Sequence, residues 1–377
     1  MNRYYIFSAP GRTEISGNHT DHQHGRVLAA AVNLETVAKV SLSADPCIRV
    51  VSEGYAPVQI NLNDLEMRPE ERNTAAALIR GVAARFAQLG AKLRGFNASV
   101  TSTVLPGSGL SSSAAFEVLM GTILNELCFD KQLSPVEIAQ VGQWAENVYF
   151  GKPCGLMDQT ASAVGGMVYI DFKDPANPVV EQLDFDFSAA GHALCIIDIG
   201  ADHAHLTEEY AAIPAEMKKV AACFGKEVLR DVSPMEFYTA MPRVRELCRD
   251  RAVLRAMHFL QENERVAKQA QALRDQDFDR FLQLCRESGH SSWMYLQNIT
   301  PAGYVGNQAM AVTLGLCEKL LDGRGACRVH GGGFAGTVQA FVPEDMLDYF
   351  RTEVDRVLGE GSCHVMSIRP EGGIRVQ

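Results

Sequence analysis

The sequence predicts an α+β fold rather than a doubly wound α/β one, and the order of its elements carries this prediction. Short β-type runs dominate the first part of the chain, whereas long helical patterns fill residues 207–322. A doubly wound parallel sheet would need strands that alternate strictly with helices, and this chain lacks that alternation. At 377 residues the chain is also long enough to bury two adjoining cores.

Most of the predicted strands lie in the N-terminal part of the chain. Runs of β-branched and alternating apolar residues predict strands over 4–9, 26–32, 36–43, 48–53, 58–62 and 95–105. Helical periodicity predicts a helix over 73–90, a helix that opens on the loop at 106–113, and a helix over 134–151. Ser134 is the expected N-cap of this last helix.

The C-terminal part is mostly helical. Strands are predicted over 166–172 and 193–200, helices through 207–322, a glycine-rich turn and strand over 328–342, a helix over 343–359 and a final strand. The segment KDPANP, residues 173–178, contains two prolines and interrupts the regular patterns. It predicts a boundary between two domains, 1–175 and 176–377.

Composition and charge narrow the classes of function. The net charge of −10 does not favour nucleic acid as a partner, and no run approaches the roughly 20 apolar residues of a membrane span. We expect a cytoplasmic protein, since the first residues lack an apolar signal region. The ten cysteines are scattered without a CxxC pair, which indicates reduced thiols. Nothing suggests an obligatory protein partner.

The segment PGSGLSSSAA, residues 106–115, has the properties of a phosphate-binding loop. Its glycines let the backbone approach an anion, its serines offer hydroxyl donors, and the helix that follows presents free N–H groups. The candidate residues are Gly107, Ser108, Gly109, Leu110, Ser111, Ser112 and Ser113. It is neither a Walker A loop, which ends in Gly-Lys-Ser/Thr, nor a Rossmann fingerprint. The alternative is an ordinary strand-to-helix turn with a serine cap.

Two acids flank a Gly-Lys-Pro-Cys-Gly turn, Glu146 before it and Asp158 after it. Phosphoryl transfer to a hydroxyl needs a magnesium ion on the phosphates and a group that takes or orients the proton of the acceptor. One carboxylate could serve each role. The alternative is that Glu146 lies on a helix surface and Asp158 is an N-cap.

The stretch GRTEISGNHTDHQHG, residues 11–25, concentrates polar side chains. His19, Asp21 and two further histidines could ligate a metal, as in a metal-dependent hydrolase, but four ligands within six residues would strain one coordination shell. In a sugar pocket, Asp21 would accept hydrogen bonds from hydroxyls, while Asn18 and His19 would donate or accept them. A solvated loop is the third alternative for the individual histidines.

Five segments taken together resemble the galactokinase branch of the GHMP kinases. GRTEISGNHTDHQHG is similar to the galactokinase signature, and PGSGLSSSAAFEV resembles the family's ATP loop. KPCGLMDQ resembles the catalytic segment, RVHGGGFAGTVQAFV resembles the third motif, and the ending IRPEGGIRV is also family-like. The resemblance spans nearly the whole chain and keeps the order of the motifs. It implies the GHMP kinase fold, with two α+β domains and the active site between them.

The resemblance also implies an activity and a role for each matched residue. The chain would be an ATP-dependent kinase that phosphorylates the anomeric C1 hydroxyl of galactose or a similar sugar. Asp158 and Arg12 would be catalytic, Ser113 and Glu146 would hold Mg²⁺, and residues 107–113 would bind ATP. The residues that would contact the sugar are Asn18, His19, Thr20, Asp21, Gly155 and Tyr210.

This chain departs from the family pattern at a few positions. The family has glutamate at the position of Asn18, a tyrosine at His22, a proline at Ala29 and a small residue such as threonine at His330. The catalytic residues are all present, so these departures concern the choice of sugar. The alternatives are a kinase for another sugar, such as N-acetylgalactosamine, and a non-catalytic sugar sensor.

Overall fold

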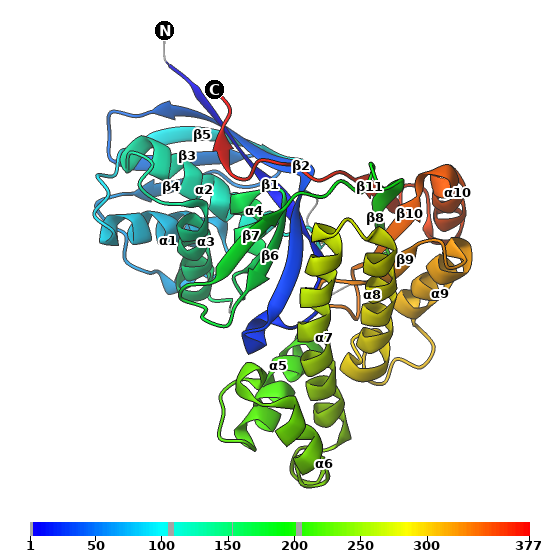
Figure 1. The fold of residues 1–377 in the computed structure, drawn as a ribbon. Helices are drawn as coiled ribbons and strands as arrows, with labels where there is room; N and C mark the ends of the chain where they lie inside the picture. The colour runs from blue at the N-terminus through cyan, green and yellow to red at the C-terminus, as the bar shows by residue number, and fades with distance from the viewer. Residues whose placement is uncertain (1–2, 105–108, 153, 201–205) are drawn as a thin grey trace. The chain divides into compact units, whose positions relative to one another are not determined.

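The computed structural model describes residues 3–104, 109–152, 154–200 and 206–377 (Figure 1). Two compact units make up the chain, and each is assembled from separate segments. The first unit comprises Met1–Thr13, Ala30–Met167 and Ile368–Gln377, and the second comprises Glu14–Ala29 and Val168–Ser367. The boundary predicted at residue 175 stays a prediction.

The first unit is built on a mostly antiparallel sheet with the strand order β12-β1-β2-β5-β3-β4. Strands β1 and β2 are long and continue into the second unit, and β6 pairs with both β2 and β7. Strands β3 and β5 form a parallel pair within this sheet. The bounds are β1 Tyr5–Ser16, β2 Arg26–Leu42, β3 Cys47–Ser52, β4 Val58–Asn61, β5 Phe96–Ser102, β6 Met167–Asp171, β7 Val179–Leu183 and β12 Ile374–Arg375.

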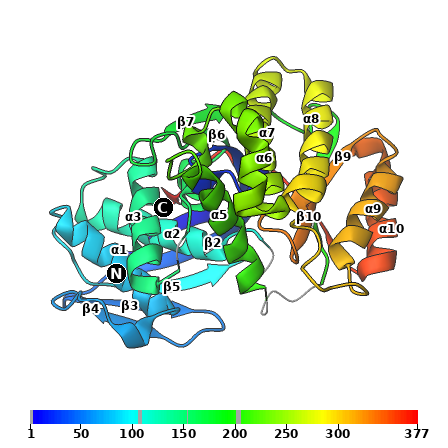
Figure 2. The ribbon, with the colours of Figure 1, turned by 90° about the horizontal axis from the view of Figure 1, so that it is seen from below.

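Helices α1 to α4 pack against one another and cover one face of this sheet (Figures 1 and 2). Helix α3 begins with a capping box, in which the Ser134 hydroxyl accepts a hydrogen bond from the Glu137 N–H and the Glu137 carboxylate accepts one from the Ser134 N–H. The predicted N-cap is therefore confirmed. The bounds are η2 Pro69–Glu71, α1 Ala75–Gln88, α2 Ser112–Cys128, α3 Pro135–Ala145, η3 Glu146–Phe150 and α4 Met157–Val164.

The second unit contains an antiparallel sheet with the order β11-β8-β10-β9, which helices cover on both faces. Because side chains alternate along β10, Val338 and Ala340 pack with α9 and α10, whereas the Phe341 ring meets the Phe281 ring of α8 at 5.2 Å. The bounds are β8 His192–Asp198, β9 Ala326–His330, β10 Thr337–Pro343, β11 Cys363–Met366, α8 Phe278–Ser291, α9 Ala309–Leu321 and α10 Leu347–Leu358.

A helical layer completes the second unit. Helices α5, α6 and α7 share a hydrophobic core that includes Phe237 and Phe259, and α5 also packs against the short turn η1 (Figure 2). The bounds are η1 Asp21–Gln23, α5 Thr207–Ala222, η4 Leu229–Asp231, α6 Pro234–Cys248, α7 Asp250–Arg274, η5 Ser292–Leu296 and η6 Glu344–Met346.

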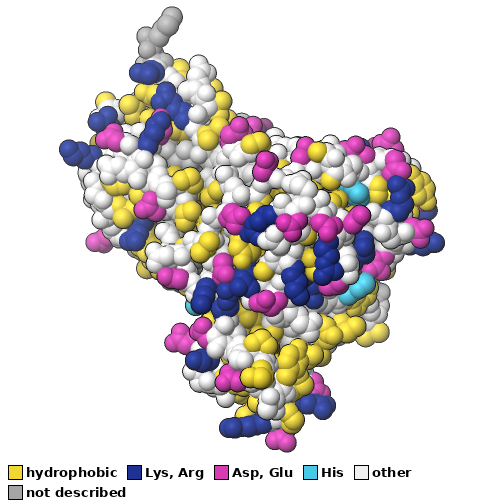
Figure 3. Space-filling view, in the orientation of Figure 1, with side chains coloured by type: hydrophobic (Ala, Val, Ile, Leu, Met, Phe, Trp, Pro, Cys, Tyr) yellow, Lys and Arg dark blue, Asp and Glu magenta, His cyan; other side chains and the backbone are white. Residues whose placement is uncertain are grey.

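The α+β prediction is confirmed, although several elements differ from the predicted ones. The strand predicted over 4–9 continues through Pro10 and Gly11 to Ser16, because residues 10–16 are also buried. The strands predicted over 26–32 and 36–43 are one strand, whereas the single final strand predicted is two strands, β11 and β12. Helix α4 and strand β7 were not predicted. None of the described helices is long and apolar enough to cross a bilayer. Acidic and basic side chains are interspersed on the face drawn in Figure 3.

Candidate active site

In the first unit, the candidate phosphate loop leads into helix α2. Gly109 has a φ of 71° and Ser111 a φ of 58°, so the backbone turns through left-handed conformations directly before the helix begins at Ser112. Ser111 occupies the N-cap position, but its hydroxyl caps no helical N–H and instead donates to Asp158 Oδ2. The serine-cap alternative is therefore wrong for Ser111. Gly107 and Ser108 lie outside the described residues.

Arg12 and Asp158 form a two-pronged ion pair beside this loop. Arg12 Nε donates to Asp158 Oδ1 and Arg12 Nη2 donates to Asp158 Oδ2, both at 2.7 Å, while Nη1 donates to the carbonyl of Gly109. The Arg12 N–H also donates to the Leu110 carbonyl at 3.0 Å. Burial raises the pKa of Asp158, but the charge and hydrogen bonds of Arg12 and the hydroxyl of Ser111 outweigh burial and hold it below its usual value.

Two further carboxylates are linked through one amide. Gln159 Nε2 donates to Glu117 Oε2 and to Glu146 Oε2, both at 2.9 Å, and Lys152 Nζ donates to Glu146 Oε1 at 3.4 Å. Glu146 is 3% exposed and Glu117 is fully buried, so the helix-surface alternative for Glu146 is wrong. Burial and the neighbouring charge of Glu146 raise the pKa of Glu117 well above its usual value.

In the second unit, the segment around Gly17 forms a closed loop. Gly17 has a φ of 100°, and a Cβ there would lie 2.7 Å from the Arg26 carbonyl, so the position requires glycine. The buried Thr20 hydroxyl is 2.9 Å from the carbonyl of Gly17 and 2.6 Å from that of Arg26. Thr20 thus closes the loop with its own side chain.

A chain of hydrogen bonds fixes the histidines of this loop. His19 Nε2 lies 3.0 Å from the Gly332 carbonyl, which can only accept, so His19 Nδ1 must accept from His22 Nε2 at 3.2 Å. His22 Nδ1 then accepts from Gln23 Nε2 at 3.3 Å. Burial lowers the pKa of His19 to about 4 and that of His22 well below its usual value, so both rings are neutral at pH 7.

These assignments leave no ring nitrogen of His19 or His22 for a metal ion. No group of three or more His, Cys, Asp or Glu side chains among the described residues could hold one either. The hydrogen bonds therefore argue against a metal site at His19 and His22.

The glycine turn of the third motif collects hydrogen bonds from this loop and from α5. Asn18 Nδ2 donates to the Gly331 carbonyl, His19 Nε2 to that of Gly332, and the Tyr210 hydroxyl to that of Gly333 at 2.8 Å. Gly333 has a φ of 81°, and a Cβ there would lie 2.2 Å from the Asn298 carbonyl. Three predicted sugar-binding residues thus meet at one turn that requires glycine.

Comparisons with known proteins agree with this arrangement. Residues 77–166 match the model of the GHMP kinases N terminal domain, and residues 2–42 match the galactokinase galactose-binding signature. A galactokinase from Streptomyces coelicolor is 32% identical over 376 residues, which cover 98% of this chain and 93% of that protein. The chain belongs to the galactokinase family.

Solved structures show the same fold. The galactokinase of Lactococcus lactis, solved in complex with galactose, is 24% identical and matches with a TM-score of 0.84 over 99% of this chain and 95% of its own. The mevalonate kinase of Methanococcus jannaschii is 13% identical and matches with a TM-score of 0.68 over 97% and 98% of the two chains. The GHMP kinase fold predicted from the motifs is therefore confirmed.

The predicted galactokinase residues fall into two groups, one in each unit. Arg12, Ser111 and Asp158 meet in the first unit, where Gly155 is half-buried three residues before Asp158. In the second unit Asn18, His19 and Tyr210 meet at the glycine turn, and Thr20 closes the signature loop. Asp21 is half-buried, and its Oδ1 accepts from the His22 N–H at 2.8 Å. The roles of all these residues in galactose and ATP binding stay predictions.

Several residues that the galactokinase fold brings close to these groups were not predicted from the sequence. Glu117 is an acid within the apolar run AAFEVLMGTIL and lies one helical turn after Ser113, a signal that could have been used. Gln159 directly follows Asp158. Glu14, Asn298 and Arg328 gave no local signal, because their partners lie far away in the sequence.

The carboxylates of Glu117 and Glu146 have the donor chemistry that a magnesium ion requires. Glu117 Oε1 is buried without a hydrogen-bond partner among the described residues, and Glu146 lies on the other side of the shared Gln159 amide. Magnesium in kinases is held by one or two carboxylates together with substrate phosphates, so a set of three protein ligands is not required. Ser113 lies half-buried in the first turn of α2. These residues fit the ion.

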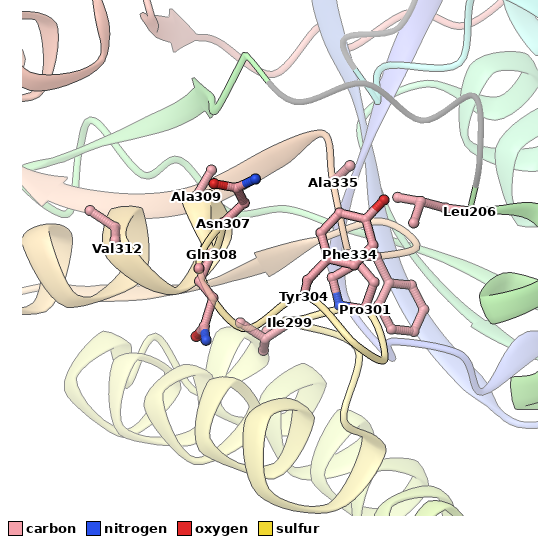
Figure 4. Close-up of a pocket in the computed structure, with 11 residues that line it drawn as sticks. Leu206, Ile299, Pro301, Tyr304, Asn307, Gln308, Ala309, Val312, Phe334 and Ala335 are labelled. Carbon is pink, nitrogen blue, oxygen red and sulfur yellow. The ribbon is translucent and has the colours of Figure 1, made fainter.

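A cavity of about 460 Å³ lies in the second unit, next to the residues that follow the glycine turn (Figure 4). Phe334 and Tyr304 lie together on one side of it, and Ala309 and Val312 of helix α9 lie on the other. Its lining is mostly apolar. None of the predicted site residues is among the described residues that line this cavity.

Proposed function

We propose that this chain is a kinase that transfers the γ-phosphoryl group of ATP to the C1 hydroxyl of galactose. Membership of the galactokinase family supports the class of reaction, a phosphotransfer to an alcohol group. The observation that carries the proposal is the two-pronged pair of Arg12 and Asp158, with two bonds of 2.7 Å, at the start of helix α2.

Asp158 acts on the sugar hydroxyl in this proposal. The lowered pKa of Asp158 keeps its carboxylate ionised at neutral pH, so that it can accept or orient the proton of the C1 hydroxyl. Arg12 holds this carboxylate in place and stabilises the negative charge that develops on the transferring phosphoryl group. The Ser111 hydroxyl donates to the same carboxylate and fixes its rotamer.

The phosphates and their cation belong at the start of α2. Residues 107–113 would bind the phosphates of ATP through backbone N–H groups, serine hydroxyls and the positive end of the helix dipole. Ser113 and Glu146 would hold Mg²⁺. When bound, the ion would neutralise part of the negative charge of the phosphates. Gln159 fixes the orientation of the Glu146 carboxylate, and Lys152 lies on its other oxygen.

The sugar belongs at the signature loop. Asp21 would accept hydrogen bonds from galactose hydroxyls, and His19, Tyr210 and Gly155 would also contact the sugar. The neutral ring of His19 is held in one tautomer, so it contributes shape rather than charge. A cytoplasmic location stays a prediction from the sequence.

The test is release of ADP by the purified protein with Mg-ATP and a panel of sugars: galactose, N-acetylgalactosamine, glucose, arabinose and none. We expect sugar-dependent turnover with galactose, at a kcat/KM at least about a hundredfold above that of glucose, because unpaired hydrogen-bonding groups penalise the wrong epimer. Turnover with N-acetylgalactosamine alone would identify that sugar, rather than galactose, as the substrate. Sugar binding without turnover would contradict the kinase and favour a sensor.

A further inference from the structure

Glu14 is a buried carboxylate of strand β1 that no family role covers. It is 4% exposed, and its Oε1 accepts from Arg328 Nη2 at 2.8 Å and from Asn18 Nδ2 at 3.1 Å. Arg328 is fully buried, and its Nη1 donates to the Ile15 carbonyl at 2.8 Å. A buried guanidinium requires a nearby anion, so Arg328 stabilises the ionised form of the Glu14 carboxyl group.

Asn18 is oriented by partners on both ends of its amide. Its Nδ2 donates to Glu14 and to the Gly331 carbonyl, while its Oδ1 accepts from Asn298 Nδ2 at 2.7 Å. The side chain is fully buried. An acid here would place a second carboxylate against Glu14 and could not donate to the Gly331 carbonyl. The local structure thus accepts an amide at position 18 and an acid at position 14.

The galactokinase signature has glutamate at position 18, so the acid of this loop lies four residues earlier in the present chain. We propose that Glu14 and Asn18 form an exchanged acid–amide pair, in which Glu14 carries the negative charge and Asn18 is a positioning residue for the glycine turn at Gly331–Gly333. Asn18 is then not a sugar contact. The proposal rests on the proposed function only for its effect on galactose binding.

The pair is connected to the glycine turn and to the strands on either side of it. The Glu14 N–H donates to His330 Nε2 at 3.2 Å, and its carbonyl accepts from Gln339 Nε2 at 2.9 Å. His330 and Asn18, two departures from the family pattern, therefore both contact Glu14. Since the side chains of His19 and Tyr210 also donate to this turn, a shift of the turn moves two residues that are predicted to contact the sugar. The expected effect is on the KM for the sugar rather than on kcat.

The experiment is an isosteric cycle of four proteins: the natural chain, E14Q, N18D and E14Q/N18D. Each substitution exchanges an acid and an amide without changing the length of the side chain. The readouts are the unfolding midpoint and, with Mg-ATP, kcat and KM for galactose and its single deoxy analogues. A matched control exists in the same unit, because exposed Asn177 Nδ2 donates to exposed Asp174 Oδ2 at 3.0 Å. N177D and D174N/N177D exchange the same groups in water.

We expect N18D to lower the unfolding midpoint by about 5 °C, because two buried carboxylates then face each other. Its KM for galactose should rise about tenfold, which corresponds to the loss of about one strong hydrogen bond. The double variant should be less impaired than N18D, although it carries one more substitution, because only one carboxylate remains in the pair. The control variants should match the natural chain in both readouts.

Two results would overturn the proposal. If E14Q/N18D is as impaired as N18D, or more so, residues 14 and 18 do not act as a pair. If N18D changes the ratio of KM values between galactose and one deoxy analogue while the unfolding midpoint stays unchanged, Asn18 is a sugar contact. The unfolding cycle needs no turnover. A chain that did not phosphorylate galactose would therefore refute the proposed function and still test the pair.

Discussion

Replacement of Arg12 tests the centre of the proposed mechanism, and the variants Arg12→Lys and Arg12→Ala test it in two steps. The Arg12 side chain is 9% exposed and makes two charged hydrogen bonds of 2.7 Å to Asp158, whose side chain is 30% exposed. Lysine keeps the charge but cannot reproduce the planar fork that spans both carboxylate oxygens. Alanine removes the charge as well.

The expected losses follow from these contacts. A charge-assisted hydrogen bond contributes about 1.5–3 kcal/mol, so Arg12→Lys should lower kcat by about 10- to 100-fold. Arg12→Ala also removes the cation from the transferring phosphoryl group, and kcat should fall by about 10³-fold or more. It leaves a poorly hydrated carboxylate unpaired. The free energy of unfolding should fall by about 2–3 kcal/mol, below the range for a fully buried pair because Asp158 is partly exposed.

The pH dependence gives an independent readout for Arg12→Ala. Burial alone raises the pKa of Asp158, and Arg12 is the main cause that lowers it. Without Arg12 the pKa of Asp158 rises, so the acid limb of kcat/KM should move to higher pH. The free energy of unfolding also depends on this pKa. In the natural chain the ionised pair stabilises the fold above the unfolded pKa of about 3.9, and this stabilisation is lost as pH falls through the lower folded pKa.

The assay is ADP release at saturating galactose and Mg-ATP over a range of pH, together with thermal unfolding of each variant. Arg356→Ala is the matched control, because Arg356 is 66% exposed and its bond to Glu353 lies on the surface. Such a pair contributes about 1 kcal/mol or less, so this variant should behave as the natural chain. If Arg12→Ala keeps more than a tenth of the natural kcat, or if Arg12→Lys loses as much as Arg12→Ala, the assignment is refuted.

Three further predictions concern the other groups of the site. Asp158→Asn should lower kcat by about 10²- to 10⁴-fold with the fold intact, whereas the exposed Asp174→Asn should have no effect; near-natural turnover of the first would remove Asp158 from the mechanism. Glu146→Gln should raise the Mg²⁺ concentration for half-maximal activity about tenfold or more, and a change in the KM for galactose instead would contradict a metal role. His19 has a folded pKa of about 4, below the unfolded value of about 6.5, so the unfolded chain binds more protons between these values. The unfolding midpoint should therefore fall as pH is lowered from about 6.5 toward 4, and His19→Gln should weaken this pH dependence. An unchanged pH dependence in the variant would show that another group causes it.

Much of the molecule could be predicted from local sequence patterns. Alternation and helical periodicity placed most strands and helices, because these periods arise from backbone geometry within a few residues. The capping box at Ser134 was readable for the same reason. The motif residues Arg12 and Asp158 were found through resemblance, and the geometry then added that the two groups form a direct pair.

The extents of β1 and β2 depended on tertiary context instead. Pro10 and Gly11 are ordinary turn residues by local preference, yet both are buried within β1. Burial against the rest of the fold overrides that preference, because an extended strand satisfies the backbone groups that water cannot reach. No local pattern contains this information.

The sequence by itself determined the fold class, the family and the residues from which phosphoryl transfer could be built. Only the tertiary structure decided which partners these side chains contact. Glu14 is the last of three consecutive polar residues in β1 and has no local pattern of its own, but Arg328, 314 positions later, pairs with it as a buried ion next to Asn18. The histidines of the signature gave the pattern of a metal site, but burial keeps His19 and His22 neutral, and hydrogen bonds with Gly332 and Gln23 occupy their ring nitrogens. The physical reason is the same in both cases: burial sets charge and protonation through partners that are near in space and distant in the chain.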